Sequence, residues 1–226
     1  MNVQVSPVWL DRAWYGKTLL KKKPYCCIQN GQLKITVFRE NGVGMRVLSC
    51  PVDTKDVCCF EVPDSLRAYC HLLLFAKDIR LTLTQLTLDV IVETPSTMIQ
   101  YKIPNILLLE DVGVDPSDQD IDVEIGTEDW FRICGTIPQK GLLAVDCNLH
   151  KRMITLKHSK NKWGAVVMAR SKALGTASFQ CRADVVRFCF KAVETLPAFG
   201  TLTFMKCGVL KWTAGFMQVY LAPHIE

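Results

Sequence analysis

The sequence lacks several features that would indicate a function directly. No apolar run approaches the roughly eighteen residues that a membrane-spanning helix needs, since the longest lie at 72–76 and 106–109. Only four histidines occur, and none stands near a Gly-x-Ser-x-Gly or other nucleophile motif. No low-complexity tract is present. We therefore expect neither a membrane protein nor an enzyme, and no cofactor or metal.

Three short segments resemble ligand-binding motifs but lack residues that those motifs need. The Gly-Lys-Thr at 16–18 is without the first glycine of a phosphate-binding loop. The acidic segment 118–122 resembles the start of a calcium loop, but Val123 stands where the tight turn needs glycine. Cys147 and His150 have ligand-like spacing, yet no second pair completes a zinc tetrad. We interpret all three as structural.

The charge and the cysteine content further restrict the class of protein to which the chain can belong. The 27 Lys and Arg residues exceed the 22 Asp and Glu residues by a formal +5, which is mild for a nucleic-acid binder. Binding of nucleic acid would therefore depend on how the basic side chains are distributed. Eleven cysteines without a basic, apolar leader predict a reducing compartment, where most of them act as small buried hydrophobes.

Alternating apolar residues dominate the chain and predict half-buried antiparallel strands. Such segments lie at 33–38, 79–84, 86–90, 121–125 and 201–204. Apolar residues at helical spacing predict amphipathic helices instead. The expected helices cover 8–20, 64–76, 128–137 and 182–194.

The order of these elements predicts an α+β protein with two similar domains. Helix, strands, helix, strands occur once, and the same order follows a polar, acidic segment rich in Asp, Pro and Ser. We expect an N-terminal domain at 1–106, a surface connector at 107–120 and a C-terminal domain at 121–226. Each would carry antiparallel sheets, with its two helices on one face.

Basic residues accompany every predicted helix. A solvated helix face is the better interpretation for any single one of them. Collectively, four helices on one side would form a basic surface that neutralises phosphates without reading bases. The candidates for DNA contact are Arg12, Lys17, Lys21, Arg67, Lys77, Arg132, Lys140, Arg187 and Lys191.

Three segments resemble one known family. Residues 216–226 end in Tyr-Leu-Ala-Pro-His-Ile-Glu, residues 128–134 read Glu-Asp-Trp-Phe-Arg-Ile-Cys, and residues 52–62 form a further match. These are similar to the C-terminus, to the Glu-Phe-Ala-Arg-Ile-Cys helix and to a loop and strand of the eukaryotic sliding clamps, the PCNA family. The chain is shorter than the cellular clamps, which suggests a diverged relative and leaves a viral origin open.

The resemblance implies a ring that encircles duplex DNA and holds a polymerase on it, closed from three identical chains by edge-to-edge strand pairing. The helices would line the hole. Arg132 and Lys191 match basic positions of the family best, whereas Gly135 and Asp184 stand where the family has basic residues. These two departures put the strength of DNA contact in doubt.

The resemblance also implies an apolar groove for short peptides of polymerases and other replication or repair proteins. Its lining would be Val52, Val57, Cys59, Val112, Val114, Ala222, Pro223 and Ile225. The expected location is the nucleus, or a viral replication site. Two alternatives stay open: a subunit of a heteromeric checkpoint ring, and a clamp-fold transcription or scaffolding factor that acts as monomer or dimer.

Overall fold

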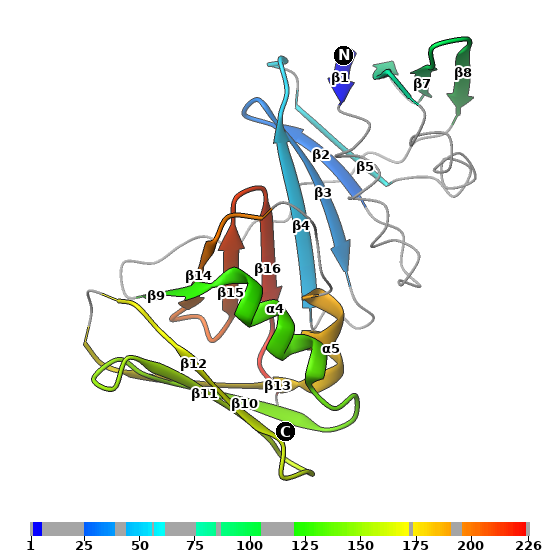
Figure 1. Ribbon diagram of the computed structural model, residues 1–226. Coiled ribbons are helices and arrows are strands. Elements are labelled where there is room, and N and C mark those ends of the chain that lie inside the picture. Colours follow the sequence, from blue (N-terminus) through cyan, green and yellow to red (C-terminus); the bar gives the residue numbers. More distant parts are fainter. Residues whose placement is uncertain are drawn as a thin grey trace. The chain divides into compact units, whose positions relative to one another are not determined.

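The chain forms two compact units built almost entirely from antiparallel strands (Figure 1). The structure is a computed structural model that describes residues 2–5, 25–38, 44–55, 57–61, 76–84, 87–104, 120–171, 174–190 and 196–224. Unit 1 comprises Met1–Phe38 and Val47–Gly113, and unit 2 comprises Arg39–Arg46 and Val114–Glu226. Within the described ranges, no helix is both long enough and apolar enough to cross a membrane.

Unit 1 contains strands of two antiparallel sheets. One has the order β5-β2-β3-β4 and the other β1-β6-β7-β8. The first residues of β4, up to Arg46, belong to unit 2. The strands are β1 (Asn2–Val5), β2 (Tyr25–Gln29), β3 (Gln32–Phe38), β4 (Gly44–Pro51), β5 (Cys58–Glu61), β6 (Asp78–Thr84), β7 (Thr87–Glu93) and β8 (Met98–Ile103).

Unit 2 contains strands of two sheets and two described helices. The sheet orders are β12-β11-β10-β13 and β16-β15-β14-β9. The helices are α4 (Thr127–Thr136) and α5 (Ala183–Cys189). The strands are β9 (Ile121–Gly126), β10 (Leu142–Asn148), β11 (Met153–His158), β12 (Gly164–Met168), β13 (Thr176–Arg182), β14 (Phe199–Phe204), β15 (Leu210–Ala214) and β16 (Met217–Leu221).

The same strand plan occurs twice in each unit. In unit 2, one strand is followed by a helix and a three-stranded meander, first as β9-α4-β10-β11-β12 and then as β13-α5-β14-β15-β16. The first strand of each repeat pairs with the other repeat's meander, β9 with β14 and β13 with β10. In unit 1, β1 pairs with β6 and β5 pairs with β2 in the same exchanged manner. The sheets therefore record an internal duplication.

The strands and the described helices agree with the expected ones. The five alternating segments correspond to β3, β6, β7, β9 and β14. The helix expected at 128–137 is α4, and α5 begins where the helix at 182–194 was expected but ends at Cys189. The helices expected at 8–20 and 64–76 lie outside the described residues, as does the connector except for Asp120.

Burial follows the alternation where one face of a sheet is covered. In β6 and β7 every second residue is buried, so each strand presents one apolar and one polar face. In β4 the first five residues are all buried, which removes the period-two pattern. The β2–β3 hairpin turns through Asn30 and Gly31, whose φ angles of 54° and 68° fit a two-residue turn with left-handed residues.

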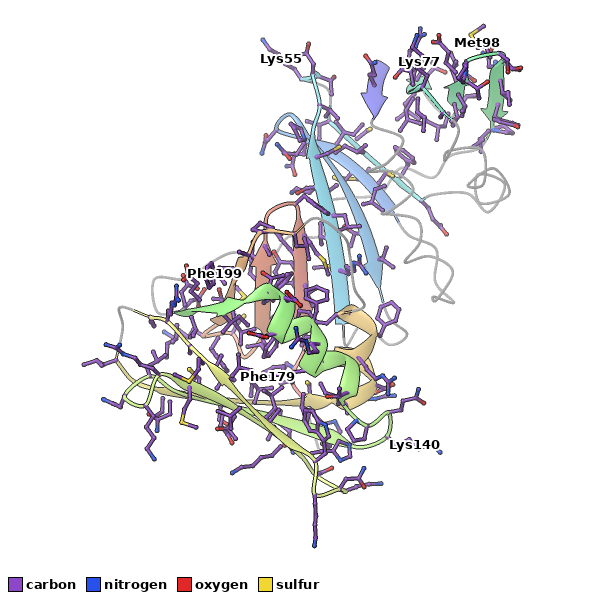
Figure 2. All side chains as sticks on the ribbon, viewed as in Figure 1. Lys55, Lys77, Met98, Lys140, Phe179 and Phe199 are labelled. Carbon is purple, nitrogen blue, oxygen red and sulfur yellow. A yellow bond between two sulfur atoms is a disulfide. The ribbon has the colours of Figure 1, made fainter. Side chains whose placement is uncertain are left out.

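Aromatic side chains join the helices of unit 2 to its second sheet. Trp130 and Phe131 of α4 meet Phe190, just after α5, in edge-to-face contacts at 5.5 and 5.7 Å. Trp212 of β15 contacts Phe131 and Phe190 in the same way, at 5.3 and 5.5 Å. Phe179 of β13 adds a buried aromatic side chain on the first sheet (Figure 2). The helices are therefore held between the two sheets of the unit by a continuous core.

Most described cysteines are buried, as their interpretation as small hydrophobes predicts. Seven of the ten are covered, and Cys207 is exposed. Cys27 and Cys59, directly opposite each other on β2 and β5, form a disulfide. Strand pairing brings these two cysteines together although they are 32 positions apart in the sequence.

Candidate nucleic-acid interface and partner surfaces

Helix α4 presents Arg132, the best-matched of the candidate DNA contacts. Trp130 and Cys134 lie on its buried face, so Arg132 points outward with 66% of its side chain exposed. Its guanidinium pairs with Glu128 at 2.7 Å, one turn earlier, and lies 3.9 Å from Asp129. These acidic residues also suit the positive N-terminal end of the helix. The exposed ion pairs are weak, so a phosphate could displace them.

Helix α5 carries its charges in two different arrangements. Arg182, at its start, forms a two-pronged contact with Asp184, with an Nη2–Oδ2 distance of 2.9 Å. Arg187 is exposed, but its Nη1 donates to the carbonyl oxygen of Ile137 at 3.1 Å. That bond satisfies a carbonyl just beyond α4 and links the two helices. Arg187 therefore positions α4 as well as adding positive charge.

The remaining candidate DNA contacts are distributed over both units. Lys140 is exposed in the loop between α4 and β10, at one end of unit 2 (Figure 2). Lys77 is exposed in unit 1, directly before β6. Five candidates lie outside the described residues: Arg12, Lys17, Lys21, Arg67 and Lys191. Three described candidates therefore lie in unit 2: Arg132 on α4, Lys140 in the loop after it and Arg187 on α5.

The described groove candidates of unit 1 have different environments. Val57 is 68% exposed just before β5, and Val52 is part-buried, with its N–H bonded to the carbonyl of Gly31 at 2.9 Å. Val52 also lines a hollow of about 430 Å³ with Asp53 and Arg80 among its neighbours. Cys59 is 5% exposed and bonded to Cys27, so its sulfur is covered.

The groove candidates of unit 2 lie in the C-terminal segment. Ala222 and Pro223 are part-exposed, and the next residue, His224, donates its N–H to the carbonyl of Gln180 on β13 at 2.8 Å. This bond fixes the direction in which the tail leaves β16. Val112, Val114 and Ile225 lie outside the described residues.

A groove lined by both apolar and charged side chains lies along β12 in unit 2, and the sequence analysis did not predict it. It measures about 420 Å³ and adjoins a second hollow of about 600 Å³. Val166 and Met168 of the edge strand β12 and Phe199 of β14 line it, with 54%, 71% and 44% exposure. Arg170 lies 4.8 Å above the Phe199 ring and 3.9 Å from Glu124. A short apolar strand at a sheet edge could have suggested this surface.

Burial makes the thiols of three cysteines in unit 2 unreactive. Burial raises the pKa of Cys147 to about 11 and holds the pKa of Cys134 and Cys181 well above the usual range. These thiols therefore stay protonated near neutral pH, whereas metals and electrophiles need thiolates. In the part of the chain that the structure describes, no group of three or more His, Cys, Asp or Glu side chains could hold a metal ion.

No protein-family model matches the chain, and no curated protein matches it.

Proposed function

We propose that the protein is a sliding clamp of the PCNA type, a processivity factor that encircles duplex DNA and holds a polymerase on it. The observation that carries the proposal is the exchanged strand plan, which occurs twice in each unit. The clamp resemblance of the tail and of residues 128–134 implies two similar domains in one chain, and two units with one strand plan fit that requirement. Function as a clamp needs no catalytic group.

The charge arrangement suits a protein that slides. Arg132 is paired with Glu128, and Arg182 with Asp184, so these helices offer only a weak attraction for phosphates. A topological link does not depend on tight contacts, and strong contacts would slow movement along the duplex. Contacts to phosphates carry no base information, so binding should not depend on sequence.

Closure of a ring requires exposed edges that can pair between copies. Two edge strands carry exposed large apolar side chains, β8 with Met98 at 67% and β12 with Val166 and Met168. Edges of this kind pair readily with another strand unless they are covered. We propose that β8 of one copy pairs with β12 of the next in a head-to-tail homotrimer.

Partner proteins would dock by short peptides on a surface of unit 1 that includes Val57. Val57 is 68% exposed beside a sheet. Exposed apolar side chains mark an interaction site when several of them form one patch. The proposed location is the nucleus or a viral replication site, in line with replication partners.

Changing Arg132 and its partner should move duplex affinity in opposite directions. Arg132→Ala is expected to weaken binding equally for unrelated sequences and to flatten the salt dependence by about one phosphate contact. Glu128→Gln should strengthen binding, because it releases Arg132 and removes a negative charge. Fluorescence anisotropy with labelled duplexes at several salt concentrations measures both. Glu124→Gln, which removes a similar charge next to Arg170, is the control; equal effects of the two glutamine variants would contradict a role of α4.

Replacing Val57 with Asp should cost about 2 kcal/mol of affinity for the terminal peptide of the cognate polymerase. The side chain is already exposed, so folding should be unaffected. Calorimetric titration compares this variant with Leu174→Asp, which charges another exposed residue at 76% exposure. Equal peptide affinities for the two variants would place the peptide site elsewhere.

A second candidate function is a clamp-fold scaffolding or transcription factor that works as monomer or dimer. The ion pairs that occupy Arg132 and Arg182, and the open helix position at Gly135, favour it because they reduce phosphate binding. Absence of duplex binding at low salt, together with retained peptide binding, would support this candidate over the clamp. A subunit of a heteromeric ring would instead bind DNA only with its partner chains.

A further inference from the structure

The chain contains a long stretch without acidic residues. No Asp or Glu occurs between Asp146 and Asp184, a region that runs from the end of β10 to the start of α5. The same stretch holds eight cationic residues: Lys151, Arg152, Lys157, Lys160, Lys162, Arg170, Lys172 and Arg182. The chain as a whole has a formal charge of only +5, so positive charge is concentrated here.

Part of this charge lies on the rigid turn between β11 and β12. His158 donates its backbone N–H to the carbonyl of Trp163 at 3.2 Å and closes the turn. The N–H of Lys160 bonds to Nδ1 of His158, also at 3.2 Å, and the imidazole is buried. Lys160 and Lys162 are both exposed. These bonds fix the backbone of the turn on which Lys160 and Lys162 lie.

Backbone hydrogen bonds connect this turn to two other segments. Ser159 and Leu142 exchange bonds at 2.9 and 3.0 Å, which ties the turn to the start of β10. Ala183 donates to the carbonyl of Gly141 at 3.0 Å, and Arg187 donates to that of Ile137 at 3.1 Å. The segments 137–142, 157–164 and 182–187 thus meet at one end of unit 2, where Lys140 stands (Figure 2).

This meeting point is strongly cationic, and we call it the basic end. Within the three segments the only acidic residue is Asp184, which is paired with Arg182. All six cationic side chains are exposed. The basic end comprises Lys140, Lys157, Lys160, Lys162, Arg182 and Arg187. Mutual repulsion of so many like charges opposes folding, and an anionic partner would relieve it.

We infer that the basic end binds the phosphate backbone of nucleic acid through Lys157, Lys160 and Lys162, which extend the clamp's candidate contacts Lys140 and Arg187 beyond the helices. Regularly repeated phosphates match several lysines held on a fixed turn, and binding releases the counterions that surround both. Trp163, part-exposed beside Lys162, adds an aromatic side chain next to the cations, a combination that suits unpaired bases as well as phosphates. This inference does not require that the protein forms a ring.

The test removes three lysines that lie outside the helices. The variant Lys157→Gln/Lys160→Gln/Lys162→Gln is prepared in the full chain, and anisotropy is measured with labelled duplex and single strands between about 50 and 200 mM salt. We expect at least a roughly tenfold loss of affinity at the lowest salt, and a salt slope reduced by about 2. A loss of affinity for both the duplex and the single-stranded probe identifies the duplex backbone as a ligand. A loss of affinity for the single-stranded probe alone identifies unpaired nucleic acid as the ligand.

The matched control is Lys55→Gln/Lys102→Gln/Lys206→Gln, which removes the same charge from exposed positions elsewhere. An equal loss with the control would overturn the inference, because net charge alone would then explain binding. An unchanged salt slope in the test variant would overturn it too, as would competition by poly-glutamate as strong as that by DNA. Measuring Arg132→Ala in parallel distinguishes the contribution of α4 from that of the basic end. If Arg132→Ala weakens nucleic-acid binding and the triple lysine variant does not, the inference about the basic end is wrong, whereas the proposed contact of α4 is supported.

Discussion

Replacing Gly200 with alanine is expected to lower the free energy of unfolding by about 3 kcal/mol. A Cβ at this position would lie 2.8–2.9 Å from three atoms of the Trp212 indole, well inside van der Waals contact. The indole is fully buried and packs edge-to-face on Phe131 and Phe190, so it has no room to shift. Urea unfolding followed by circular dichroism measures the loss.

Gly135→Ala is the matched control, because a Cβ there meets no atom within 4 Å. Gly135 lies in α4 and is exposed, so alanine should stabilise the protein by about 0.5–1 kcal/mol through helix propensity. The two substitutions add the same methyl group, but they are expected to change the free energy of unfolding in opposite directions. If Gly200→Ala were as stable as the wild type, the packing between β14 and β15 described above would be incorrect.

Replacing Met168 with aspartate is expected to abolish assembly of the proposed trimer. Met168 is 71% exposed on the edge strand β12, beside Val166 and Phe199, so a carboxylate there would have to lose its hydration on burial in an interface. Removing one partner's apolar contact in this way typically costs several kcal/mol at an interface centre. Folding should be unaffected, because the side chain is exposed in the single chain.

Leu174→Asp provides the comparison, since Leu174 is 76% exposed in the loop before β13 and lies outside that groove. Sedimentation velocity of both variants at micromolar concentration distinguishes them. A trimer that persists in the Met168→Asp variant would show that the edge of β12 is not an assembly surface. Loss of assembly in both variants would point to a general effect of added charge.

The elements that could be predicted from sequence are those whose two faces differ. β6 and β7 alternate strictly, and α4 buries Trp130 and Cys134 four residues apart, so their periods are readable. The start of β4 is buried on both faces and carries no period. The exchange of first strands between repeats depends on pairing across long sequence separations, which a local pattern cannot specify.

The sequence predicted the helical position of Arg132 but not its side-chain partners. Apolar residues at helical spacing predicted the helix that carries Arg132. The pairing of Arg132 with Glu128 depends on side-chain geometry, which the sequence pattern does not specify. Lys157, Lys160 and Lys162 lie at the end of β11 and on the turn after it, where no helical periodicity draws attention to them. The absence of acidic residues between Asp146 and Asp184 was a readable signal, and only the fold shows that three segments meet there.

The mass of the native particle in solution tests the central claim most directly. A sliding clamp of this type must close from several copies, so native mass spectrometry or sedimentation equilibrium of the purified full chain should give three times the chain mass of 25.5 kDa. That mass should persist across micromolar concentrations. A particle that remains a monomer or a dimer throughout that range would contradict the proposal of a homotrimeric clamp.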